Sequence, residues 1–214
     1  MGESFRFTRN QNDRSVGGTT MPKKSRNTRG KIVSAAWKLF YDQGYDETTI
    51  EDIIFESGTS KGSFYHYFNG KDDLLSTLSV IFDEKYESLI DEMKEEKPAL
   101  ETLLFLNREL FALIDASVPL ELLSRLLSSQ LVTHGERHLL DRNRTYFKLL
   151  HQIVRRGQEQ GDLRSDVSAN EIVTGYAMLE RGMMYEWCLN NGAYSLAQMA
   201  ETQMPKLLEG YRKK

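Results

Sequence analysis

The chain has 214 residues, of which 40% are hydrophobic and 28% charged, a composition typical of a soluble globular protein rather than a disordered one. A single cysteine, Cys188, excludes an internal disulfide and cysteine-based zinc fingers, and no apolar run approaches the ~18 residues of a membrane span. The net charge is −3, yet residues 1–31 carry eight basic and two acidic side chains. We therefore expect a cytoplasmic protein, without a membrane partner, whose N-terminal end meets a polyanion. A solvated basic tail without a partner is the alternative.

The first predicted helix follows a polar N-terminal segment. Residues 1–25 lack any helical period and are expected to form a disordered basic tail. From Arg29 onward, apolar residues recur at the spacing of one helix face, and Gly44 is expected to end this helix in the left-handed conformation.

Two short helices are predicted next, separated by a break at residues 57–59. Thr49, followed three residues later by Asp52, is typical of a capping box, and Ser60 is a second N-cap. Phe64 and Phe68 lie one turn apart and are expected on the buried side of the second helix. This places Tyr65, His66 and Tyr67 on its more exposed side.

This arrangement is that of a helix-turn-helix. A second helix of about eight residues is sized for the DNA major groove, which is about 12 Å wide. Its first turn, Ser60-Lys61-Gly62-Ser63, carries small or basic residues that can approach bases and phosphates closely. Free N–H groups at a helix start also favour phosphate.

The rest of the chain is predicted to form long helices. Their expected ranges are about 72–96, from Pro98, from Pro119, about 136–160, about 168–189 and from Ser195, with a kink or split at Pro205. No segment alternates with the period of a strand over more than a few residues. The expected fold is all-α with about nine helices, and the expected domains are 26–75 for DNA binding and 76–214 for effector binding and dimerisation.

Residues 28–75 resemble the N-terminal DNA-binding domain of the TetR family of transcriptional regulators. The most specific segments are Phe64-Tyr65-His66-Tyr67-Phe68 with the following Asn69-Gly70-Lys71-Asp72-Asp73-Leu74-Leu75, and Gly44-Tyr45 before Thr48-Thr49-Ile50. Gly157 and the later Gly161-Asp162-Leu163-Arg164 resemble the loop before the family's penultimate helix. The resemblance implies a homodimeric repressor that binds a palindromic operator in double-stranded DNA and is released by a small-molecule effector.

The resemblance also implies roles for single residues. Thr49 would cap its helix against a DNA phosphate, and Tyr65 would bond a phosphate through its hydroxyl. Lys61 and Ser63 would face base edges or phosphates, and Lys71 would pair with the DNA backbone. The expected DNA-binding residues are Thr49, Ser60, Lys61, Gly62, Ser63, Tyr65, His66, Tyr67 and Lys71.

Effector and dimer residues are expected in the C-terminal part. Apolar, aromatic and basic candidates for the effector pocket are Phe82, Tyr86, Phe105, Arg108, Phe147, Tyr176, Arg181, Met183, Met184 and Trp187. A seam of small residues, Ser168, Gly175 and Gly182, has Ile172 and Leu179 beside it. Such a seam suits a close helix contact, and the resemblance assigns Ile172, Gly175, Leu179 and Gly182 to the dimer interface. The same spacing is equally consistent with close packing within one chain.

Other readings of the sequence compete with this one. Gly58-Thr59-Ser60-Lys61-Gly62 matches the G-x-S-x-G elbow of serine hydrolases, but that elbow needs a preceding strand, and the isoleucines here have helical spacing. His134 and His138 could hold a metal with Asp141, although a solvated helix face is favoured. We therefore expect no catalytic, metal or cofactor site. The alternatives left open are an all-α enzyme and a helical partner-binding protein whose helix-turn-helix does not read DNA.

Overall fold

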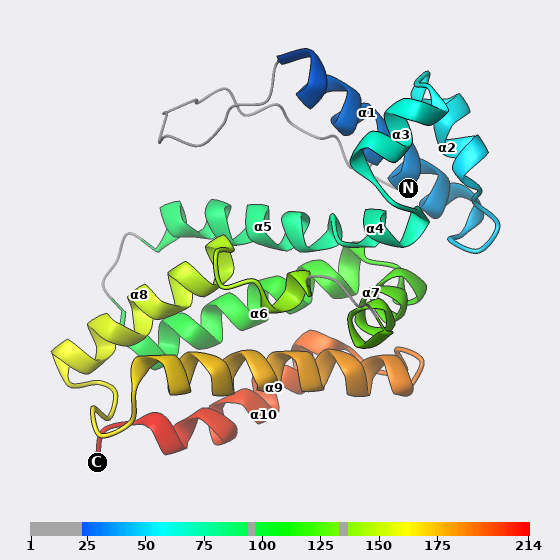
Figure 1. The fold of residues 1–214 in the computed structure, drawn as a ribbon. Coiled ribbons are helices and arrows are strands. Elements are labelled where there is room, and N and C mark those ends of the chain that lie inside the picture. The colour runs from blue at the N-terminus through cyan, green and yellow to red at the C-terminus, as the bar shows by residue number, and fades with distance from the viewer. Residues whose placement is uncertain (1–22, 94–96, 133–136) are drawn as a thin grey trace.

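A computed structural model describes residues 23–93, 97–132 and 137–214, and every regular element within these ranges is helical (Figure 1). They contain ten α-helices, two short 3₁₀ turns and one isolated β-bridge, between Leu163 and Arg212. Two of the ten, α4 and α5, are separated by only two residues and were predicted as one helix. The prediction of an all-α fold with about nine helices is confirmed.

The helices form a small head and a larger body. The head consists of α1 (Lys23–Gln43), α2 (Ile50–Ser57) and α3 (Lys61–Tyr67). The body consists of α4 (Lys71–Leu75), α5 (Leu78–Glu92), α6 (Ala99–Ser117), α7 (Leu120–Val132), η1 (His138–Leu140), α8 (Thr145–Gln160), α9 (Ala169–Leu189), α10 (Leu196–Leu208) and η2 (Glu209–Tyr211). Figure 1 shows the head above one end of the body, with α4 and α7 nearest to it.

The head is held together by apolar residues that recur every three or four positions. Ile32, Ala36 and Phe40 from α1 are buried with Ile53 from α2 and Phe64 from α3. Because all three helices contribute to this cluster, α2 and α3 are held in a fixed orientation relative to α1. The head is therefore a rigid platform for the exposed side of α3.

The body is a stack of long helices around α6. α6 contacts α5, α8 and α10, and α9 contacts α7, α8 and α10. α5, α6 and α9 run side by side along the body in Figure 1. None of the helices in the described ranges is long and apolar enough to cross a membrane.

Several predicted boundaries differ from those in the structure. α1 begins at Lys23, so residues 23–25 are helical rather than part of the expected tail, and residues 1–22 lie outside the described residues. The helix expected over about 136–160 ends at Gln160 as predicted, but it begins only at Thr145. Before it, the Asp141 carboxylate accepts the Asn143 N–H at 2.8 Å in a turn that competes with the helix. α10 runs through Pro205 to Leu208, so the helix does not split there. Gly44 follows α1 with a φ of 89°, as expected.

Candidate DNA-binding face and effector cavity

The start of α2 is capped as the sequence predicted. The Asp52 N–H donates to the Thr49 hydroxyl at 3.1 Å, and the Thr49 N–H donates back to the Asp52 carboxylate at 2.9 Å. The Thr49 hydroxyl also donates to the Asp52 carboxylate at 2.7 Å. This hydrogen bond and the one from the Thr49 N–H lower the pKa of the Asp52 carboxyl, so the capping box stays formed at neutral pH. Thr49 is exposed, so its side chain is accessible to solvent at the start of α2.

The turn between α2 and α3 depends on a glycine. Gly58 has a φ of 61°, a left-handed backbone conformation that residues other than glycine rarely adopt. Its N–H donates to carbonyl oxygens of the last turn of α2. Ser60 then caps α3 by accepting the Ser63 N–H at 3.1 Å. No strand precedes Ser60 within the described residues, so the hydrolase elbow is excluded here.

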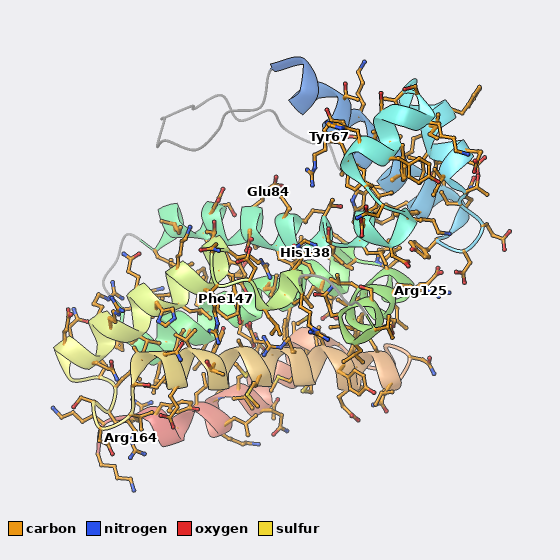
Figure 2. The ribbon with its side chains drawn as sticks, viewed as in Figure 1. Tyr67, Glu84, Arg125, His138, Phe147 and Arg164 are labelled. Atoms are coloured by element: carbon orange, nitrogen blue, oxygen red, sulfur yellow. The ribbon has the colours of Figure 1, made fainter. Side chains whose placement is uncertain are left out.

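The two faces of α3 are clearly divided. Phe64 and Phe68 are buried, as predicted, whereas Tyr65 is 47% exposed and His66 is exposed. Tyr67 is more exposed than Phe64 and Phe68, as predicted, but it is half-buried against the core, with its ring centroid 4.7 Å from that of His66. It is the last residue of α3 (Figure 2).

Lys61 and Gly62 lie in the exposed first turn of α3. The Lys61 ammonium is 3.3 Å from the Glu51 carboxylate, and both side chains are about two-thirds exposed. Such exposed pairs contribute little to stability, so Lys61 is free to exchange Glu51 for another anion. A Cβ at Gly62 would meet only the Ser60 hydroxyl, at 4.0 Å, so the folded chain alone does not require glycine here.

Lys71, which is expected to contact the DNA backbone, also makes contacts within the chain. Its ammonium donates to the carbonyl oxygens of Tyr45 at 2.6 Å and Thr48 at 2.8 Å, and it lies 4.2 Å from the Tyr45 ring centroid. A third carbonyl, that of Asp46, lies at 3.4 Å. These contacts fix the turn that precedes α2, and the DNA contact of Lys71 stays a prediction.

The head touches the body through contacts that sequence reasoning missed. The Arg125 guanidinium on α7 pairs with the Asp46 carboxylate and lies 5.6 Å from the Tyr45 ring centroid. The Tyr41 hydroxyl donates to the Ser117 carbonyl at the end of α6. Figure 2 shows Arg125 on the side of the body that faces the head. These residues are far apart in the sequence and have no motif of their own, so no local pattern could have found them.

A partly open cavity lies in the body between α5, α6, α7, η1, α8 and α9. Its space is about 30 Å³, enough for about one water molecule. The apolar part of its wall consists of Phe82, Leu110, Leu123, Leu126, Leu127, Leu139 and Met184. Among the expected pocket residues, Phe82, Tyr86, Arg181 and Met184 line it.

The remaining wall is polar and buried. The Glu180 carboxylate, 2% exposed, accepts the Asn107 amide at 2.9 Å and the Tyr146 hydroxyl at 2.6 Å. Arg144 donates to both oxygens of Asp83 at 2.9 and 3.0 Å, and both side chains are largely buried. Neither Glu180 nor Arg144 was singled out from the sequence, because a charged residue on a helix is usually solvated.

The other expected pocket residues lie elsewhere. Four are buried in the core but do not line the cavity, because they pack between helices: Phe147, Tyr176, Met183 and Trp187. The hydroxyl of Tyr176, for example, donates to the Leu103 carbonyl at 2.9 Å. Phe105 and Arg108 line a surface groove between α6 and α10 instead.

The expected dimer seam is divided between interior and surface. Ile172 is fully buried within the single chain, so it cannot contact a second copy. A Cβ at Gly175 would lie 2.2 Å from the Tyr211 hydroxyl, which shows that this glycine admits a residue of its own chain. Leu179 is half-buried, and Gly182 is exposed with nothing within 4 Å of a Cβ.

The possible metal site has no support in the described residues. They contain no group of three histidine, cysteine, aspartate or glutamate side chains that could hold an ion. His138 begins a 3₁₀ turn rather than continuing a helix, and His134 lies outside the described residues.

Two family profiles match the two parts of the chain. That of "Bacterial regulatory proteins, tetR family" matches residues 32–78, which include α2, α3 and their support. That of "YsiA-like protein, C-terminal region" matches residues 82–210, more than half of the chain. The chain belongs to the TetR family of transcriptional regulators. Its relatives and its fold are those of regulators, not of enzymes.

Individual relatives of this TetR-family regulator cover nearly its whole length. The "Fatty acid metabolism regulator protein" of Bacillus subtilis is 23% identical over 86% of this chain and 95% of its own. The "HTH-type transcriptional repressor KstR2" of Mycobacterium tuberculosis is 24% identical over 86% and 93%. The crystal structure of Thermus thermophilus FadR, a TetR-family repressor in complex with lauroyl-CoA, matches with a TM-score of 0.69 and 26% identity over 85% of this chain and 94% of its own.

Proposed function

We propose that this TetR-family regulator is a repressor that binds a palindromic operator as a homodimer and leaves it when a small molecule enters the body. The observation that carries the proposal is the exposed side of α3, a short helix capped by Ser60 and held by buried Phe64 on a rigid head. Two such heads would enter successive major grooves about 34 Å apart. Lys61, Ser63, Tyr65 and His66 would read bases or hold phosphates there.

The effector we propose is an acyl thioester of coenzyme A. The similar Thermus thermophilus repressor is described in complex with lauroyl-CoA, and the Bacillus subtilis relative is named for fatty acid metabolism. The leucine-rich wall of the cavity suits an acyl chain. Because the cavity is small without ligand, an acyl chain must push its walls apart, and that displacement is the signal.

α7 is the helix that would carry this signal to the head. Leu123, Leu126 and Leu127 on α7 line the cavity, while Arg125 on the same helix pairs with Asp46 in the head. A ligand that displaces α7 therefore changes the position of the head relative to the body. A ligand that binds one head position better than the other shifts the population between them.

The dimer would form on the outer side of α9. Met178, Tyr185 and Leu189 are 50–61% exposed, and together with Gly182 they repeat at the spacing of one helix face. On α10, Leu207 is 47% exposed. Exposed apolar residues that follow one face are typical of an interface between protein chains.

The direct test is operator binding followed by release. Fluorescence anisotropy with DNA from the gene's own promoter should show tight binding that weakens steeply with salt and resists scrambled competitor. Lauroyl-CoA should then release the DNA, whereas coenzyme A alone should not. Binding without sequence preference would contradict the repressor proposal, and specific binding that no acyl thioester reverses would contradict only the proposed effector.

The dimer has its own test in two glycines of α9. Gly182→Gln places a polar side chain on the proposed interface and should convert the dimer to monomer in light scattering. Gly175→Gln should instead disturb the packing of Tyr211 within one chain. A Gly182→Gln protein that remains fully dimeric would remove this face from the proposal.

A further inference from the structure

One hydroxyl in the cavity wall has no hydrogen-bond partner. Tyr86 on α5 is 1% exposed, it lines the cavity, and its oxygen atom contacts neither donor nor acceptor within the described residues. Buried polar groups almost always have a partner, because removing one from water without replacement is costly. Burial raises the pKa of this hydroxyl, so it keeps its proton and can act as a donor.

The polar neighbours of this hydroxyl form hydrogen bonds with one another. Tyr146, whose ring centroid is 5.2 Å from that of Tyr86, already donates to Glu180. The second Glu180 oxygen accepts from Asn107. The rest of the wall combines apolar residues, such as Phe82 and Leu110, with Arg144, whose guanidinium is paired with Asp83. Tyr86 is therefore a residue of the cavity wall with an unpaired hydroxyl, and a ligand or a water in the cavity would supply the missing partner.

The charges around the cavity indicate what kind of ligand atom fits. Arg144 is paired with Asp83, and the wall holds one further guanidinium, that of Arg181, and one further carboxylate, that of Glu180, so the formal charges of these four side chains sum to zero. A buried anion would therefore find no net positive charge to compensate its loss of water. A neutral oxygen, as in a carbonyl or a hydroxyl, needs only a donor.

We propose that Tyr86 is a specificity-determining residue whose hydroxyl donates to a neutral oxygen on the acyl part of the effector. This inference rests on the proposed acyl-thioester effector and deepens it. Two sources share the chemistry: the thioester carbonyl, and an oxygen farther along an oxygenated chain. A plain hydrocarbon segment in the same place leaves the hydroxyl unpaired and binds more weakly.

Three coenzyme A derivatives with twelve-carbon chains separate these sources. S-dodecyl-CoA has no acyl oxygen, lauroyl-CoA has the thioester carbonyl, and a hydroxylated lauroyl-CoA adds a chain oxygen. Their potencies in releasing the operator are compared between the wild type and Tyr86→Phe. We expect the variant to lose about tenfold in potency for the derivative whose oxygen meets Tyr86 and nothing for S-dodecyl-CoA.

Two controls keep structural effects apart from recognition. Tyr211→Phe also removes one tyrosine hydroxyl, but beside Gly175 and away from the cavity, and should change no potency. Tyr86→Phe should keep or raise the thermal unfolding midpoint, because it removes an unpaired buried group. A lowered midpoint would mean that the hydroxyl already has a partner in the free protein and would overturn the proposal.

A second measurement needs neither coenzyme A nor DNA. Cyclohexanone and cyclohexane have nearly the same size and differ in one carbonyl oxygen. Cyclohexanone should raise the unfolding midpoint of the wild type more than that of Tyr86→Phe, and cyclohexane should affect both equally. If the wild type and Tyr86→Phe respond equally to cyclohexanone and equally to each coenzyme A derivative, the role of Tyr86 is overturned. If this difference holds while no thioester releases the operator, the thioester proposal fails and the role of Tyr86 stands.

Discussion

The head and the body of this regulator place their functional groups in opposite ways. The head exposes Lys61, Tyr65 and His66 on a helix whose position is fixed by a few buried residues such as Phe64. The body encloses Tyr86 and Glu180 in a cavity to which several helices contribute. A surface that meets a long, rigid polyanion must be in place before contact, whereas a cavity for a flexible ligand can open on binding. This difference agrees with the concentration of the most specific sequence motifs in the head.

The largest expected effect comes from removing the support of the head. Phe64→Ala deletes a fully buried aromatic ring and should destabilise the head by about 3–5 kcal/mol. Operator binding should disappear, while hydrogen exchange should show the helices of the body still protected. Tyr65→Phe, which removes only an exposed hydroxyl, is the matched control and should leave the unfolding midpoint unchanged. Near-normal operator binding by Phe64→Ala would mean that α3 does not depend on this platform.

The two lysines of the head should behave differently. Lys71→Ala removes the contacts to the Tyr45 and Thr48 carbonyls and should lower the stability of the head by about 2 kcal/mol. Lys61→Ala should leave the stability of the head unchanged and weaken operator binding roughly tenfold. It should also lower the number of counterions released on DNA binding, read from the slope of log K against log salt concentration, by about one. Denaturation curves and anisotropy at several salt concentrations check both. Equal loss of stability in the two variants would contradict this division.

A smaller effect should appear at the junction between head and body. Arg125→Ala removes the pair with Asp46 and should leave operator affinity nearly unchanged, but should require roughly fivefold more effector for release. Lys38→Ala breaks a comparable pair with Glu56 inside the head and should leave the effector response intact. Should both variants respond to effector like the wild type, α7 would not be the connecting element.

The smallest effect concerns pH. Burial raises the pKa of the Glu180 carboxyl above its ordinary value of 4.5, against the opposing effect of the hydrogen bonds from Asn107 and Tyr146. The folded state therefore holds this proton more tightly than the unfolded chain, and stability is lost as the pH rises from 4.5 through the folded-state pKa. Glu180→Gln should lose less unfolding free energy over that interval than the wild type. Glu159→Gln on the exposed side of α8 is the control, and parallel pH profiles for all three proteins would refute the prediction.

Local signals in the sequence were sufficient for the head. The Thr49 and Ser60 caps, Gly58 between them and the buried pair of Phe64 and Phe68 all depend on residues within one or two turns of each other. Such short-range preferences survive in any tertiary context, so the helix-turn-helix could be placed without a structure. They did not reveal that Lys71 turns inward, because its partners are carbonyls more than twenty residues earlier in the chain.

The body depended on long-range packing. The sequence by itself determined that it is helical, and its apolar and aromatic residues were recognisable as core or pocket candidates, but not which of them face a cavity. Phe147 and Tyr86 have the same helical context in the sequence, yet only Tyr86 lines the cavity. Likewise, Gly175 and Gly182 are equivalent in spacing, and only the position of Tyr211 separates interior from surface. Which face of a helix meets which neighbour is set by the summed packing of all helices, and no local pattern encodes that sum.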